Sequence, residues 1–133
     1  MIDQRTGSMT LSGVEVKPLL ELSRFIASVL GKHAKKSFQH ADWLNYQAPI
    51  GDSLDAVFVF KGGVLVETRL SMRSTQESSW TTWSEAEEAK RKAGHDALLR
   101  QELGNPPYRF SWGVVESVLD QKGGGSQIIL RYL

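Results

Sequence analysis

The sequence predicts an α+β domain, a two-layer sandwich in which two hairpins form a four-stranded antiparallel sheet and two main helices cover one face. Three observations predict this fold class. Each of two β-rich stretches folds back at a glycine-rich turn, a helical pattern precedes each stretch, and the helices are segregated from the antiparallel strands. The 133 residues suit a single domain with one hydrophobic core.

The chain is expected to begin with a flexible tail. Residues 1–13 are polar and contain turn-forming glycine and serine, so we expect them to stay loose. Residues 14–133 show no internal repeat and no linker-like stretch, which indicates one α+β domain. Apolar residues make up 41% of the chain and charged residues 23%, values that are typical of folded globular proteins.

A first helix is predicted from Pro18 to Leu30. Proline suits the first helical position because its missing N–H costs nothing there, and Gly31 can take the conformation that ends a helix. Apolar residues recur between them at three- and four-residue spacing. They are Leu19, Leu22, Ile26, Val29 and Leu30.

The pattern over residues 35–50 is mixed. A short second helix and an irregular crossing segment both fit the spacing of Phe38, Trp43 and Tyr46. Pro49 and Gly51 then close this stretch as a loop.

The first hairpin is predicted from Ala56 to Met72. Residues 56–60 are apolar and rich in β-forming side chains, and Lys61-Gly62-Gly63 supplies a tight turn. The return strand alternates from Glu67 onward, which predicts one face toward the core and one toward solvent. The core-side series is Thr68, Leu70 and Met72, and the solvent-side series is Glu67, Arg69, Ser71 and Arg73.

A second helix is predicted to begin at Ser84 and to end at Gly104, before two prolines that forbid its continuation. Ser84 and Glu87 have the spacing of a capping box. A stripe of small side chains indicates close packing of this helix on the sheet. Its members are Ala86, Ala89, Ala93 and Ala97, and Leu99 and Leu103 continue it. Two pairs of charges are expected on the outer surface of the helix, Glu87 with Arg91 and Glu88 with Lys92.

A second hairpin completes the chain, with strands at 108–119 and 127–133 around a glycine-rich turn. In a regular strand Trp112 shares a face with Phe110 and Val114, and we expect the alanine stripe of the second helix to cover that face. Gly113 indicates a bulge or a close approach by another backbone. The last strand is placed at the sheet edge, where it would pair with another chain in a homodimer.

Charge and hydropathy bear on the partners and on the compartment. The formal net charge is +1, so the basic excess that favours nucleic-acid binding is missing. A small basic cluster could contact an anion, but a solvated helix end is the favoured interpretation. The cluster consists of Lys32, Lys35 and Lys36. No apolar run reaches the length of a membrane span, and the N-terminus lacks a secretory-signal pattern. We therefore expect a cytoplasmic protein without a membrane partner.

Catalytic residues do not converge in the sequence. The chain has no cysteine, and His33 and His40 lie two helical turns apart, so we expect no metal site and no cofactor. His95 beside Asp96 could act as a catalytic base oriented by a carboxylate. A lone histidine is, however, more often a partly exposed helix residue. The glycine-rich turn at 123–126 lacks the lysine and the following helix of a phosphate-binding loop.

The aromatic residues give the candidate binding site. Trp80 and Trp83 lie in a polar stretch before the second helix, and Trp43 and Tyr46 lie in the ambiguous segment. Tryptophans in polar loops line ligand pockets or anchor protein interfaces, although they more often fold back over the core. We take these four residues and His95 as the candidate binding residues.

The C-terminal part of the chain also carries a resemblance. The residues that carry it are His95, Asp96, Leu99, Leu103, Gly104, Tyr108, Phe110, Trp112, Gly113, Asp120, the glycine-rich turn and Ile128 to Tyr132. With these features the stretch 95–132 resembles small uncharacterised bacterial proteins of the toxin-immunity or mobile gene-cassette type. The resemblance implies an interaction protein, and because its motifs are structural it implies no catalytic residue.

Two functional hypotheses follow. The favoured one is a non-enzymatic protein that binds another protein, as an immunity-like or accessory factor does. The alternative is a small-ligand-binding protein or a small enzyme with an aromatic-lined pocket between helices and sheet. An exposed apolar patch would support the first hypothesis, and a concave apolar pocket with a few polar groups would support the second.

Overall fold

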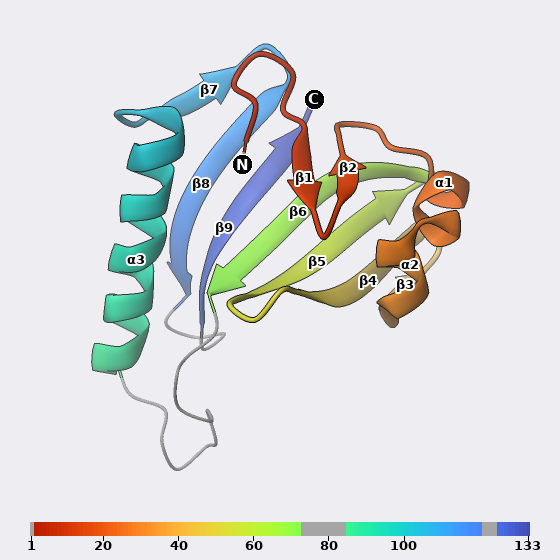
Figure 1. Ribbon diagram of the computed structural model, residues 1–133, viewed down its shortest axis with the longest axis horizontal. Coiled ribbons are helices and arrows are strands. Elements are labelled where there is room, and N and C mark those ends of the chain that lie inside the picture. The colour runs from red at the N-terminus through yellow and green to blue at the C-terminus, as the bar shows by residue number, and fades with distance from the viewer. Residues whose placement is uncertain (1, 73–84, 121–124) are drawn as a thin grey trace.

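The computed structural model describes residues 2–72, 85–120 and 125–133 (Figure 1). In chain order the elements are β1 (Met9–Leu11), β2 (Val14–Val16), α1 (Leu22–Ala27), α2 (Val29–His33), β3 (Lys35–His40), β4 (Trp43–Ile50), β5 (Leu54–Lys61), β6 (Val64–Met72), α3 (Glu85–Leu103), β7 (Tyr108–Phe110), β8 (Gly113–Asp120) and β9 (Gly125–Tyr132).

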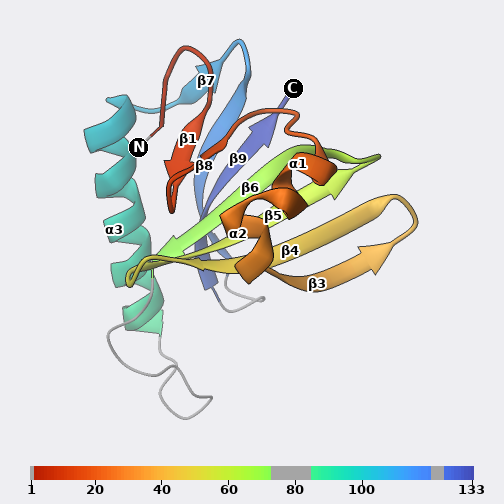
Figure 2. The ribbon, with the colours of Figure 1, turned by 45° about the vertical axis from the view of Figure 1, so that its right-hand side comes forward.

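One large antiparallel sheet organises the described residues. Seven strands follow the order β3-β4-β5-β6-β9-β8-β7, and β1 and β2 form a separate two-stranded sheet. The helices and the β1–β2 hairpin lie on the same face of the large sheet (Figures 1 and 2). The predicted four-stranded sheet with two main helices is therefore wrong, because residues 35–50 add two strands and residues 108–119 divide into two.

The hydrophobic core lies between the sheet and the elements on that face. Its inner-face strand residues alternate with outward residues, as a half-covered antiparallel sheet requires. The sheet contributes Ala48, Ile50, Ala56, Phe58, Phe60, Leu65, Leu70, Val115, Ile128 and Leu130. The covering elements contribute Met9, Leu11, Val16, Leu20, Phe25, Leu30, Leu99 and Leu103.

The first predicted hairpin is confirmed. β5 and β6 pair antiparallel around Gly62 and Gly63, both of which have positive φ. Thr68 and Leu70 are fully buried on the inner face, and between them Arg69 lies on the other face, as the alternation predicts.

The single helix predicted from Pro18 to Leu30 is instead two short helices. Ser28 separates them with extended backbone, and its hydroxyl donates a hydrogen bond to the Phe25 carbonyl at 2.6 Å. The same oxygen accepts from the Gly31 N–H at 3.1 Å, so Ser28 caps α2. Gly31 therefore lies inside α2 rather than at a helix end.

The second long helix is confirmed as α3, but only part of the predicted stripe is buried. Leu99 and Leu103, which continue the predicted stripe, are buried as expected, whereas the alanines at 89, 93 and 97 are exposed and His95 is buried instead. Glu88, expected on the outer surface, is buried, and its carboxylate accepts hydrogen bonds from the Ser126 N–H and from Arg91. The capping-box serine at 84 lies outside the described residues.

Trp112 is buried by a different neighbour from the one predicted. It stands in the turn between β7 and β8, where the N-terminal segment covers it instead of the alanine stripe. That segment, expected to be a loose tail, forms β1 and contributes Met9 and Leu11 to the core. The close approach predicted at Gly113 is confirmed, because a Cβ there would lie 2.1 Å from the Arg131 carbonyl oxygen.

The last strand is not at an edge. β9 lies between β6 and β8, so the predicted edge that would pair in a homodimer is already paired within the chain. The edges of the large sheet are β3 and β7. Within residues 2–72, 85–120 and 125–133, no helix has both the length and the apolar character needed to cross a bilayer.

Candidate functional site

Most of the exposed large apolar side chains of the described residues come from one stretch of the chain. Six large apolar side chains of the described residues are exposed, and five of them fall between residues 19 and 43. They are Leu19, Ile26, Val29, Phe38 and Trp43, and they are between 39% and 60% exposed. One end of the molecule, which we call the hairpin end, is formed by α1, α2 and the β3–β4 and β5–β6 turns (Figures 1 and 2). Ile26 and Val29 lie on the helices that cover the inner face of the sheet, whereas Phe38 and Trp43 lie on the outer face, so the exposed side chains of this end form two separate groups.

Phe25 fixes the two short helices on the sheet. Its fully buried ring lies 5.0 Å from the Phe58 ring, 5.2 Å from Phe60 and 5.6 Å from Tyr46, measured between centroids. Because this one aromatic residue holds α1, the following Ile26 is left on the solvent side. The apolar stripe of the sequence is thus divided between the core and the surface.

Leu19 is held in a strained conformation at the same end. Its φ of 63° lies in the left-handed region that disfavours residues with a Cβ. The Leu19 N–H donates to the Leu65 carbonyl at 3.0 Å, and the Leu65 N–H donates to the Leu20 carbonyl at 2.8 Å. These bonds to β6 impose the backbone angle and leave the leucine side chain half in solvent.

Two exposed aromatic side chains share the outer face of the sheet, the face opposite the helices. Phe38 pairs with Asn45 and His40 pairs with Trp43, so Phe38 and Trp43 are diagonal neighbours on adjacent strands. Lys61 pairs with Trp43 from the other side and places its ammonium 5.0 Å from the indole centroid. The outer face of the β3–β4 hairpin therefore combines exposed aromatic surface with positive charge.

The remaining outer face carries charges that neutralise each other. Glu67 accepts hydrogen bonds from Arg69 at 2.6 Å and from Arg131 at 3.2 Å, and Arg131 also donates to Glu116 at 2.8 Å. The hydrogen bond to Glu116 is the main cause that raises the pKa of Arg131. Two carboxylates and two guanidinium groups are thus paired across β6, β9 and β8, and this region offers little free charge to a partner.

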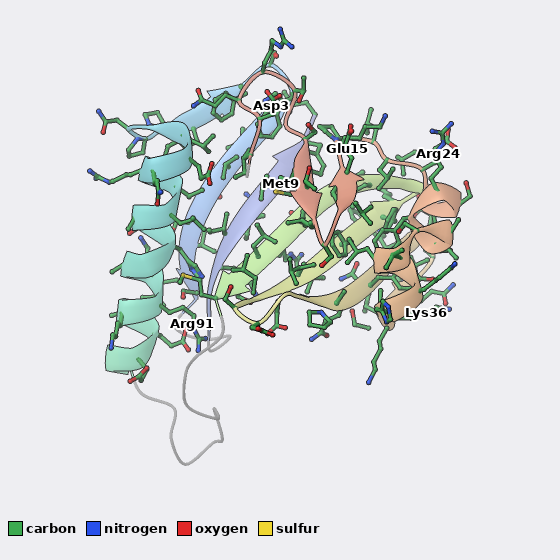
Figure 3. The ribbon with its side chains drawn as sticks, in the orientation of Figure 1. Asp3, Met9, Glu15, Arg24, Lys36 and Arg91 are labelled. Atoms are coloured by element: carbon green, nitrogen blue, oxygen red, sulfur yellow. The ribbon has the colours of Figure 1, made fainter. Side chains whose placement is uncertain are left out.

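The hairpin end is basic by contrast. Residues 22–47 contain Arg24, Lys32, Lys35 and Lys36 against a single acidic residue, Asp42. Arg24 lies 3.8 Å from Glu21, but no carboxylate of the described residues forms an ion pair with the three lysines. Figure 3 labels Lys36 at this end, and its ammonium donates a hydrogen bond to the Gln39 side-chain oxygen at 3.1 Å. Lysines that lack a carboxylate partner and lie near exposed apolar groups form a surface suited to an acidic partner.

The three candidate binding residues that the structure describes lie in different places and do not form one pocket. Trp43 lies on the outer face, whereas Tyr46 lies on the inner face with its ring 5.6 Å from Phe25. His95 is on α3, which packs on β6, β8 and β9. Trp80 and Trp83 lie outside the described residues. Of the three candidates that the structure describes, Trp43 alone is exposed at the hairpin end.

His95 is a buried residue and not the partly exposed one expected. Its Nε2 accepts a hydrogen bond from the Met72 N–H at 3.0 Å, which ties α3 to the end of β6. Burial is the main cause that lowers the pKa of His95 to about 4, and the positive charge of Arg91 acts in the same direction. A neutral imidazole that accepts a backbone hydrogen bond has a structural role here.

A cleft of about 350 Å³ lies between α3 and β8. Its lining is mostly polar and charged, and the ammonium of Lys92 is already bound to Asp96 at 3.0 Å. Aromatic walls, expected for a pocket between helices and sheet, are limited here to Tyr108. This cleft does not match the aromatic-lined pocket of the alternative hypothesis.

Sequence reasoning identified Trp43 but missed the other exposed members of the hairpin end. Ile26 and Val29 fit the buried stripe of a continuous helix, and only Ser28, a favourable N-cap residue, signals the break that exposes them. Phe38 stands in a polar strand without alternation, so no periodic signal distinguishes it.

Comparisons with protein-family models, with curated proteins and with solved structures find no match to this chain. The function must therefore be argued from the surface itself.

Proposed function

We propose that this chain is a non-enzymatic binding protein that docks another protein through the hairpin end, in the manner of an immunity-like or accessory factor. One observation carries the proposal. The exposed rings of Phe38 and Trp43 lie diagonally on one outer face of the β3–β4 hairpin, at an end whose lysines have no carboxylate partner among the described residues. An interface needs an apolar centre with a polar rim, and this end supplies both.

The anchors are the two aromatic residues on the outer face. Aromatic side chains carry a large share of binding free energy when a partner desolvates them. Phe38 and Trp43 lie on two paired strands of a rigid sheet, so little conformational entropy is lost on binding. The conformation of Leu19 supports the same interpretation, because strain that holds an apolar group in solvent is typical of functional positions.

Site-specific photocrosslinking tests the proposal. A benzophenone amino acid is placed at position 38 or 29 of the full chain, and the chain is expressed in the organism that encodes it. Exposed positions 15 and 97, on β2 and on α3, serve as controls. We expect one protein to be joined reproducibly from positions 38 and 29 and not from the controls. Equal crosslinking from all four positions, or none from positions 38 and 29, contradicts the proposal.

A further inference from the structure

The β3 strand is a free edge of the large sheet. It pairs with β4 on one side, and it is the first strand in the order of the sheet. All six of its residues are exposed. A strand in this position presents a row of N–H and C=O groups along its outer side, which another strand can use.

The opposite edge is much less open. β7 has three residues, and Tyr108 within it is buried. The Phe110 ring at its end stacks on Trp112 with centroids 5.0 Å apart and planes 3° from parallel. A short and partly buried edge offers little backbone to a partner, so β3 is the edge available for strand addition.

The side chains of β3 favour a partner with negative charge. Lys35 faces outward with Phe38, and Lys36 faces inward, because a register irregularity between Lys36 and Phe38 shifts the alternation. Lysine on an edge strand discourages self-association, since pairing two copies would bring like charges together. The same lysines, together with Lys32 at the end of α2, favour a strand that carries carboxylates.

We infer that β3 accepts an extended acidic segment of a protein partner as an eighth strand of the sheet. The backbone of that segment bonds to the outer side of β3, and its carboxylates pair with Lys32, Lys35 and Lys36. An apolar side chain of the segment packs on Phe38. This inference rests on the proposed function and adds the mode of binding and the chemistry of the partner.

The first experiment selects a displayed library of random twelve-residue peptides on the full chain. An enriched peptide is then synthesised and titrated calorimetrically into the wild type and into the Lys35→Glu/Lys36→Glu double variant. We expect acidic peptides with alternating apolar residues, and at least tenfold weaker binding to the double variant. The matched control, Lys90→Glu/Arg100→Glu, makes the same change of net charge at exposed positions on α3 and should bind as the wild type does. Basic or uncharged enriched peptides, no enrichment, or equal losses in both variants would overturn the inference.

Amide hydrogen exchange distinguishes strand addition from side-chain docking. In the free chain, the β3 amides that point away from β4 should exchange rapidly. With the acidic peptide bound, these amides should be protected at least tenfold, while the exchange of β7 stays unchanged. Protection elsewhere, or a peptide-independent dimer formed through β3 in light scattering, contradicts strand addition. A partner that is crosslinked from position 38 but leaves the β3 amides unprotected removes this inference and leaves the proposed function standing.

Discussion

The indole N–H of Trp112 donates a hydrogen bond to the backbone carbonyl of Gln4 at 2.8 Å, across 108 positions of the chain. The indole is 9% exposed and lies under the N-terminal segment, and its other ring neighbours are Phe110 and Tyr132. This contact joins the first residues of the chain to the turn between β7 and β8. The N-terminal segment is therefore part of the folded domain.

Replacing Trp112 with alanine should lower the free energy of unfolding by about 3–5 kcal/mol, because a large buried ring and a buried hydrogen bond are lost together. Trp112→Phe should cost less, since it keeps ring contacts and loses the N–H donor. Trp43→Ala, at an exposed position, should change stability by less than about 1 kcal/mol. Urea denaturation measures all three, and similar small losses in all of them would contradict the burial of Trp112.

Of the glycines in the N-terminal segment, Gly7 should tolerate substitution least. Its φ is +76°, and a Cβ at this position would lie 2.4 Å from the Trp112 ring. Gly7→Ala combines an unfavourable backbone with a clash, and we expect a loss of about 2–4 kcal/mol. Gly13→Ala is the control, because its φ of +78° is similar and its surroundings are open, so only about 1 kcal/mol should be lost. Equal losses in the two variants would mean that the indole does not pack on Gly7.

His95 should make stability depend on pH. Its folded pKa of about 4 lies below the unfolded value near 6.5, so the unfolded chain binds the extra proton first. The stabilisation is fully present above pH 6.5 and is lost as the pH falls toward 4, by roughly 2–3 kcal/mol. His95→Gln keeps a hydrogen-bond acceptor for the Met72 N–H but does not titrate. The stability difference between wild type and variant should therefore shrink between pH 7 and pH 4, and a constant difference would show that His95 is not buried in the neutral form.

Leu19 gives a way to separate binding from stability. Leu19→Gly relieves the positive φ, a gain of about 1–2 kcal/mol that the greater freedom of glycine in the unfolded chain partly offsets. We expect the variant to be as stable as the wild type or up to about 1 kcal/mol more stable, and to bind the crosslinked partner more weakly. Thermal unfolding and calorimetry measure the two quantities. A destabilised variant with unchanged affinity would show that the leucine serves the fold alone.

The parts of the fold that the sequence predicts are those with a clean local signal. The β5–β6 hairpin has glycines at its turn and an alternating return strand, and α3 ends at a glycine with positive φ before two prolines. The β3 strand lacks such a signal, because all six of its residues are exposed and an exposed edge strand need not alternate. β4 does alternate, with Ala48 and Ile50 buried on the inner face, but the sequence does not predict this strand, because the pattern over residues 35–50 is mixed and Pro49, which lies within β4, indicates a loop.

The error on α3 has a specific physical cause. Two polar residues occupy its buried face, because Glu88 accepts a hydrogen bond from the Ser126 N–H and His95 accepts one from the Met72 N–H. Because polar residues occupy the buried side, the apolar residues of α3 do not follow the helical period there. The exposed alanines do recur at helical spacing, and their pattern therefore predicts them as the buried face. Contacts of this kind depend on residues far along the chain, as does the cover over Trp112, and no local pattern predicts them.

The candidate site was predictable only in part. The sequence identifies Trp43 as a candidate from its placement in an ambiguous segment. Phe38 is recognised as part of the same site only from the structure, which places the two side chains diagonally on one face. Ile26 and Val29 required knowledge that the helix breaks at Ser28. A surface that is assembled from two short helices and a hairpin has no linear motif.

Calorimetric titration of the crosslinked partner into the purified chain tests the central claim most directly. The wild type is compared with the Phe38→Ala/Trp43→Ala double variant and with a double variant at exposed α3 positions, Lys90→Ala/Arg100→Ala, after thermal unfolding has shown that all three are folded. We predict that the aromatic double variant binds at least thirtyfold more weakly, corresponding to about 2 kcal/mol for a binding hot spot, and that the α3 variant binds as the wild type does. Unchanged affinity in the aromatic double variant would contradict a binding function for the hairpin end.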